Sequence, residues 1–122
     1  MHHVINDKFP WGDLKGKIDC FPLYKYVEEM NIPSVYVKIS KLKYYNNYIS
    51  EDSDRYKKAN LDLPGLVVDF EDHYRLIDGK HRVTKILNNR GTRFLCHILS
   101  KDQALKFYTT KPLPAYPTDY NK

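Results

Sequence analysis

The alternation of apolar and polar residues predicts short strands and helices along most of the chain. Residues 34–40, with the sequence SVYVKIS, alternate between apolar and polar positions as a half-buried strand does. Before them, residues 22–31 place Leu23, Val27 and Met30 at a spacing that puts all three on one face of a short helix. A helix followed by a strand is therefore expected after the N-terminal region.

The middle of the chain predicts a loop, a helix and a β-hairpin. Residues 41–50 are polar and rich in tyrosine, which indicates a loop, and residues 51–61 carry acidic side chains before basic ones, as an exposed helix does. The apolar segments 66–70 and 73–77 flank a two-residue acidic turn. Two strands at this separation predict a hairpin, although the turn lacks the glycine that such turns favour.

Another helix and another strand are expected after the hairpin. Val83, Ile86 and Leu87 form an apolar stripe at helical spacing, and Gly91 follows as a natural C-terminal stop. Residues 92–99, with the sequence TRFLCHIL, alternate as a strand does. The order of elements thus mixes helices and strands instead of grouping them by type.

Length and pattern together predict one small α+β domain with a mixed sheet and flanking helices. The chain has 122 residues, of which 42% are hydrophobic, and this fits a single core. Ser100 and Gln103 form a capping box that opens a last helix. The domain is expected to span 21–108, after an N-terminal extension at 1–20 and before an extended tail at 109–122 that is rich in proline and tyrosine.

Composition narrows the expected partners. The net charge of +5 and the pI of about 9.1 favour a polyanion such as a nucleotide or DNA. Neither a signal peptide nor a run of about 18 apolar residues is present, so we expect a soluble, cytoplasmic protein without a membrane partner. The two cysteines make no disulfide framework, and Cys96, inside a predicted strand, is interpreted as a small buried side chain. The sequence leaves the oligomeric state open.

The segment with the clearest chemistry is residues 78–82, DGKHR, which joins the predicted hairpin directly to a helix. A helix that starts this way leaves its first backbone N–H groups unpaired at the positive end of its dipole, where anions bind. Gly79 allows a phosphate to approach the backbone closely. Lys80, His81 and Arg82 add cationic donors, so these residues predict a phosphate site, the alternative being a solvated first turn of the helix.

Asp78 does not fit a simple phosphate site, because a carboxylate repels phosphate unless a metal or a hydroxyl lies between them. One interpretation makes Asp78 a magnesium ligand or a general base. The other makes it only a cap that accepts a hydrogen bond from the following helix. The sequence leaves both interpretations open.

The order of these elements and the turn between them resemble the ParB/sulfiredoxin-like family. The resemblance covers residues 34–108 and is most specific at residues 77–82, IDGKHR. It implies a ParB/sulfiredoxin-like fold in which Gly79, Lys80, His81 and Arg82 hold the phosphates of a nucleotide. In sulfiredoxins the reactive cysteine directly precedes the His-Arg pair. Lys80 stands at that position here, so reduction of cysteine sulfinic acid is not expected.

Within that family, the turn is most similar to the D-G-x-H-R version of the free-serine-kinase branch. That similarity implies ATP or another nucleotide with Mg²⁺, an aspartate of the turn and an earlier glutamate, for which Asp78 and Glu51 are the candidates. The alternative for Glu51 is a role at the surface only. The chain ends before the helix-turn-helix module of partition proteins, so a partition role is not expected. The resulting hypothesis is a nucleotide-dependent phosphotransferase or NTPase.

In the same family the helix expected at 51–61 faces the phosphates. Its residues Arg55 and Lys58 lie three positions apart on one face, so they are further candidates for phosphate binding. The alternative is that both lie on a solvated helix surface.

A second hypothesis is a DNA-binding or nuclease module that uses the same basic turn. Three tyrosines beside two lysines could stack on unpaired bases while the lysines contact phosphates; they are Tyr44, Tyr45 and Tyr48 with Lys41 and Lys43. The alternative for these tyrosines is a cover over the core at the loop. A third hypothesis is a catalytically inactive domain that binds a protein partner through this surface.

Overall fold

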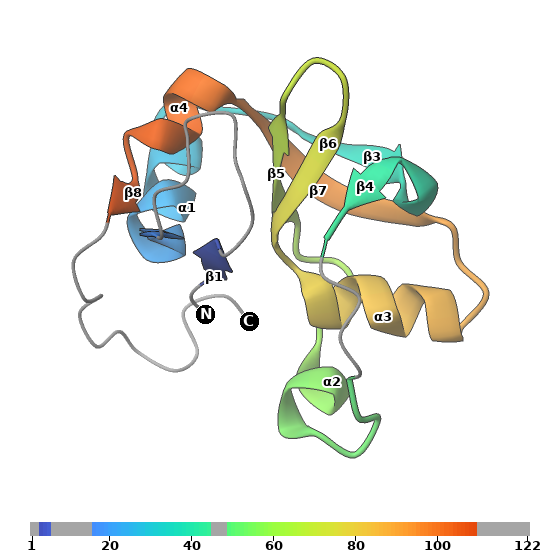
Figure 1. The fold of residues 1–122 in the computed structure, drawn as a ribbon. Helices are drawn as coiled ribbons and strands as arrows, with labels where there is room; N and C mark the ends of the chain where they lie inside the picture. Colours follow the sequence, from blue (N-terminus) through green and yellow to red (C-terminus); the bar gives the residue numbers. More distant parts are fainter. Residues whose placement is uncertain (1–2, 6–15, 45–48, 110–122) are drawn as a thin grey trace.

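The computed structural model describes residues 3–5, 16–44 and 49–109, which form an α+β fold (Figure 1). The helices are α1 (Cys20–Glu29), α2 (Asp54–Lys58), α3 (Lys80–Asn88) and α4 (Lys101–Leu105), with a 3₁₀ turn at Ile39–Lys41. The central sheet contains β3 (Ser34–Lys38), β4 (Leu42–Lys43), β5 (Gly65–Asp69), β6 (Tyr74–Asp78) and β7 (Arg93–Ser100). A second sheet contains β1 (His3–Ile5), β2 (Gly16–Ile18) and β8 (Tyr108–Thr109).

The central sheet is mixed. Among the described residues its strand order is β3-β7-β5-β6-β4. The β5–β6 pair and the β3–β7 pair are antiparallel, whereas β7 runs parallel to β5 and β4 runs parallel to β6. A strand parallel to its neighbour needs a crossover connection, and α3 lies in the one between β6 and β7. The expected mixed sheet with flanking helices is confirmed.

Helices pack on both faces of the central sheet, with α1 and α4 on one side and α3 on the other (Figure 1). Successive residues of a strand point to opposite faces, so each strand contributes to two cores. The first core, with α1 and α4, contains Ile18, Cys20, Leu23, Val27, Leu66, Val68, Phe70, Ile77, Leu99 and Ala104. The second core, with α3, contains Val37, Ile39, Leu42, Val67, Leu76, Val83, Phe94 and Cys96.

Part of the expected N-terminal extension belongs to this core. Ile18 and Cys20 are fully buried, and the backbone N–H of Asp19 donates to the carbonyl of Phe107 at 2.9 Å. β2 pairs with β1 on one side and with β8 on the other. The segment before residue 21 therefore closes the first core, while the tail at 110–122 lies outside the described residues.

Two of the predicted helices differ from the observed ones. α1 begins two residues earlier than expected and ends before Met30, whose side chain is 57% exposed instead of facing the core. The helix expected at 51–61 shortens to α2, which begins after Ser53, whose hydroxyl accepts a hydrogen bond from a backbone N–H of its first turn. The backbone leaves the helical conformation at Ala59, with ψ of 119°, so the helix ends there.

The predicted turns are found, with one change in detail. The hairpin between β5 and β6 is confirmed, and Glu71 takes the positive φ of 76° that its glycine-free turn requires. The capping box of Ser100 is confirmed as well. After α3, however, Arg90 and not Gly91 has the left-handed conformation, with φ of 64°. Within the described ranges, no helix has both the length and the apolar content needed to span a bilayer.

The ring of Phe94 fills a space that two glycines leave empty. A Cβ atom at Gly79 would lie 2.5 Å from Cζ of this ring, and a Cβ atom at Gly65 would overlap the same atom. Gly79 also has φ of 122°, a conformation that other residues rarely adopt. Since Phe94 is only 1% exposed, the ring cannot move aside into solvent. The second core therefore requires glycine at both positions.

We expect Gly79→Ala to lower the free energy of unfolding by roughly 2–4 kcal/mol, because it adds backbone strain and overpacks Phe94, each costing about 1–3 kcal/mol. Phe94→Leu, which shortens the ring, should remove part of that cost in the double variant. Urea denaturation of the two single variants and the double variant measures this coupling. Additive effects would show that the ring and the glycine do not interact.

Cys96 is fully buried in the second core, and burial raises the pKa of its thiol to about 12. A thiol is attacked as the thiolate, so Cys96 should react very slowly with a thiol reagent at pH 8 in the native protein. Cys20 is also fully buried. The measurement is the rate of colour release from an aromatic disulfide, with the denatured protein as the control that exposes two thiols. Rapid release from the folded protein would contradict this prediction.

Candidate functional site

The turn at residues 78–82 joins the end of β6 to the first turn of α3. Gly79 occupies the N-cap position, and its carbonyl accepts the first intrahelical hydrogen bond, from Val83 N–H at 2.9 Å. The N–H groups of Lys80 and His81 precede that bond and therefore have no acceptor within the helix. They lie at the positive end of the helix dipole, as the sequence predicts.

Asp78 is fully buried and bonded to α1. The hydroxyl of Tyr24 donates a 2.5 Å hydrogen bond to its Oδ2 atom. Burial, together with the negative charge of Asp78, raises the pKa of Tyr24 well above its ordinary value. The N-cap residue of α3 is Gly79, so the interpretation of Asp78 as the cap of this helix is wrong. Its carboxylate instead links the turn to the first core.

Arg82 also points into the protein. Only 6% of it is exposed, and its Nη1 atom donates to the carbonyl of Leu63 at 3.2 Å. Its positive charge acts to lower the pKa of Tyr24, opposing the effect of Asp78. Tyr24, Asp78 and Arg82 therefore form a buried polar cluster, and the arginine predicted as a phosphate ligand has its guanidinium within it.

Lys80 and His81 remain partly exposed at the surface of the turn. Partial burial lowers the pKa of Lys80. Partial burial is also the main cause that lowers the pKa of His81, and the positive charges of Arg55 and Lys80 lower it further. The Nδ1 atom of His81 is shielded from solvent and has no hydrogen-bond partner among the described residues. We call the basic side chains of Arg55, Lys80 and His81 the cationic cluster, in which His81 becomes charged only when it binds a proton.

Contacts between α2 and α3 hold the helix that carries Arg55 against α3. The Nζ atom of Lys85 donates to the carbonyls of Lys57 and Ala59, each at 3.2 Å, where α2 ends. In addition, the side-chain amide of Asn88 donates to the hydroxyl of buried Tyr56 at 3.1 Å. Figure 1 shows the resulting position of α2 directly beside α3.

Two other predicted site residues lie away from the turn. Glu51 accepts a 3.3 Å hydrogen bond from the side-chain amide of Asn88, the last residue of α3. A helix rises 1.5 Å per residue, so this contact lies roughly 12 Å from the first turn and from Asp78. Lys58 is exposed, and no hydrogen bond or ion pair joins it to the turn in the part of the chain that the structure describes.

The residues of the turn do not fit the magnesium ion that the resemblance implies. Asp78 is the only carboxylate in the turn, and its Oδ2 atom is already bonded to Tyr24 inside the protein. Mg²⁺ keeps several waters and needs open space around its ligands. No three His, Cys, Asp or Glu side chains gather as a metal site within 3–5, 16–44 and 49–109.

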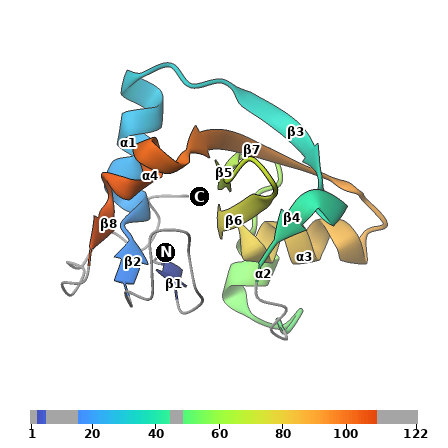
Figure 2. The same ribbon diagram turned by 45° about the horizontal axis from the view of Figure 1, so that its top comes forward.

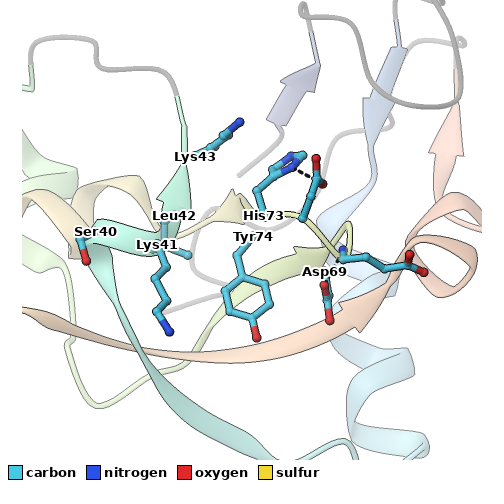
Figure 3. Close-up of a pocket in the computed structure, with 9 residues that line it drawn as sticks. Ser40, Lys41, Leu42, Lys43, Asp69, His73 and Tyr74 are labelled. Carbon is cyan, nitrogen blue, oxygen red and sulfur yellow. Dashed lines mark hydrogen bonds and ion pairs between the residues drawn. The ribbon is translucent and has the colours of Figure 1, made fainter.

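A depression of about 440 Å³ lies at the other end of β6, between β4 and the β5–β6 turn (Figure 3). It is lined by Ser40, Lys41, Leu42, Lys43, Asp69, Glu71, Asp72, His73 and Tyr74. Figure 3 shows Lys41 and Lys43 extending in opposite directions, so they do not converge on one ligand group.

The negative charges of the acidic side chains in the depression also offset the positive charges of its lysines. Asp72 bonds His73 at 2.8 Å, and this bond lowers the pKa of Asp72. Of the three tyrosines proposed to stack on bases, Tyr44 is half-buried and packs on the second core. Tyr45 and Tyr48 lie outside the described residues.

Sequence reasoning missed Tyr24 and the carbonyl of Leu63. Tyr24 flanks the apolar stripe of α1, and a buried tyrosine hydroxyl needs a hydrogen-bond partner, so its position carried a signal. The carbonyl of Leu63 carried no such signal, because every residue has a backbone carbonyl.

Comparison with known proteins does not assign this chain to a family. A scan against models of protein families finds no match, and a search of curated proteins finds no significantly similar sequence.

We expect Tyr24→Phe to lower the free energy of unfolding by roughly 1.5–3 kcal/mol near pH 7, because it removes a hydrogen bond to a buried carboxylate. The unfolded chain ionises Tyr24 near pH ~10, whereas the folded protein keeps the proton to higher pH. The contribution is therefore complete below about pH 10 and falls as the pH rises further.

Urea denaturation of both proteins between pH 7 and pH 11 measures this difference, which should shrink above pH 10. Tyr26→Phe is the matched control, because Tyr26 lies in the same helix and its hydroxyl accepts only a 3.5 Å hydrogen bond, from the side-chain amide of Gln103, among the described residues. Equal losses in the two variants would show that the bond to Asp78 has no special weight.

Proposed function

We propose that this chain is a ParB/sulfiredoxin-like domain that binds a phosphate group of a nucleotide at the first turn of α3. The order of a strand, a helix, the hairpin of β5 and β6, the D-G-K-H-R turn, α3 and β7 supports this proposal. The phosphate ligands are the N–H groups of Lys80 and His81 and the side chains of the cationic cluster, Arg55, Lys80 and His81.

The observation that carries the proposal is that Lys80 and His81 begin α3 beside α2, so that the positive charge of Arg55 acts on His81. Basic side chains at a helix N-terminus oppose the helix dipole, and the charges of Arg55 and Lys80 already lower the pKa of His81. A phosphate placed at this turn would neutralise these charges and accept hydrogen bonds from the helix N–H groups. The same arrangement without an anion is electrostatically unfavourable.

The geometry supports phosphate binding more directly than phosphoryl transfer. A general base must reach its substrate within hydrogen-bond distance, and Asp78 is fully buried against Tyr24. Glu51 lies at the opposite end of α3. In this proposal Asp78 and Arg82 hold the turn in place. The phosphate is contacted by Lys80, His81 and Arg55.

The experiment is a thermal-shift series with ATP, ADP, CTP and GTP, each with and without Mg²⁺. A ligand that binds only the folded protein raises its melting temperature. We expect a shift with at least one nucleotide and its loss in the Arg55→Ala/Lys80→Ala variant. If a DNA oligomer shifts the melting temperature and no nucleotide does, the alternative of a DNA-binding module replaces this proposal. No shift by either would contradict both.

His81 gives the binding a specific pH dependence. Its pKa is lowered in the free protein, so the imidazole is mostly neutral at pH 7, and a bound phosphate would favour its charged form. Affinity should therefore rise as pH falls from 7.5 to 6, and this rise should be smaller in His81→Asn. Calorimetry on both proteins measures it, and protonation of the nucleotide itself affects both equally.

The matched control is His73→Asn, since His73 lies at the far end of β6, in the β5–β6 turn. It should retain the full pH dependence of the wild type. An identical pH dependence in wild type and His81→Asn would exclude His81 from the site, even if nucleotide binding itself persists.

A further inference from the structure

The outer face of β3 and β7 carries an exposed aromatic ring beside two basic side chains. In the antiparallel pair, Tyr36 lies opposite Leu95, and Lys38 lies opposite Arg93. Residues directly opposite share a face, and so do residues two positions apart, so all four belong to one face. Tyr36 is 65% exposed, which leaves its ring available for contact.

This face is covered at one end of the sheet and open at the other. Leu99 of β7 lies on it and is fully buried in the first core. Figure 2 shows α1 and α4 at that end of β7, whereas β3 lies at the opposite end. The second core lies on the other face, where Val37 and Phe94 are buried. The open part of the face is therefore the area around Tyr36, Leu95, Lys38 and Arg93.

An anion would stabilise the pair of basic side chains, Lys38 and Arg93. Like charges directly opposite each other in a sheet are destabilising, and both Lys38 and Arg93 are exposed. Neither forms an ion pair with an acidic side chain of residues 16–44 or 49–109. A polyanion would remove the repulsion, and the net charge of +5 would attract it.

We propose that this outer face binds a single-stranded nucleic acid segment, with one base stacked on Tyr36 and the adjacent phosphates at Lys38 and Arg93. Side chains two residues apart on a strand are separated by about 6.8 Å, so the cations lie one step from the ring along the sheet. An aromatic platform with flanking cations is the combination that sequence-independent single-strand binding uses. In a duplex the bases are paired and stacked on one another, so none is available to stack on the ring.

This inference is independent of the phosphate site at α3, because β3 and β7 supply all of its residues. The two sites are distinguished by their variants. Arg55→Ala/Lys80→Ala should abolish nucleotide binding and leave the contribution of Tyr36 to oligonucleotide binding unchanged.

The test is fluorescence anisotropy of a labelled 15-residue oligothymidylate titrated with the full chain at low salt. Tyr36→Ala should weaken binding roughly 5- to 150-fold, the range that loss of one base–aromatic stack gives. Tyr36→Phe should retain the affinity, because the ring stacks without its hydroxyl. The Lys38→Ala/Arg93→Ala variant should reduce the slope of log K against log salt by about 1.4, or ~0.7 for each phosphate that the protein no longer neutralises.

Val35→Ala is the matched control, because Val35 is also exposed on β3 but points to the other face. It should bind like the wild type, and circular dichroism should show that every variant is folded. Absence of oligonucleotide binding, or equal affinity of Tyr36→Ala and wild type, would overturn the proposal. A concentration-dependent dimer that Tyr36→Ala abolishes, without oligonucleotide binding, would assign the face to a second copy of the chain.

Discussion

The packing of Phe94 against two glycines is the contact on which the rest of the structure depends. The ring comes from β7, Gly65 begins β5, and Gly79 follows β6, so three strands meet at one side chain. Without side chains at the two glycines, the backbone of the turn can lie directly on the ring. The first turn of α3 is held at a fixed distance from the sheet for this reason, and its N–H groups and cations keep their place.

The turn is fixed from both sides of the sheet. Phe94 and Val83 hold it to the second core, while the hydrogen bond from Tyr24 to Asp78 holds it to α1 and the first core. A turn with one such attachment could rotate about it. With two attachments on opposite faces, the direction in which α3 leaves the sheet is fixed, and this is the preorganisation that the proposed phosphate site needs.

The sequence predicts what is local and misses what is distant. The hairpin, α3 and the capping box follow from spacing along the chain, and Lys80 and His81 lie where their position after a strand places them. Partners that lie far apart in sequence leave no such pattern. Tyr24 and Asp78 are 54 residues apart, and the sequence around either residue does not indicate that the two are in contact. The burial of Arg82 could not be predicted either, because one of its partners is a backbone carbonyl, which leaves no pattern in the sequence.

The parallel pairing of β5 and β7 determines when the turn can take its final form during folding. The β5–β6 hairpin can form early, because its strands are adjacent in sequence. β7, however, reaches β5 only after the intervening hairpin strand and helix have closed a long loop, and it carries Phe94 with it. We therefore expect the geometry of the turn at residues 78–82, the proposed phosphate site, to be absent from partly folded chains and to form only when the whole sheet has assembled.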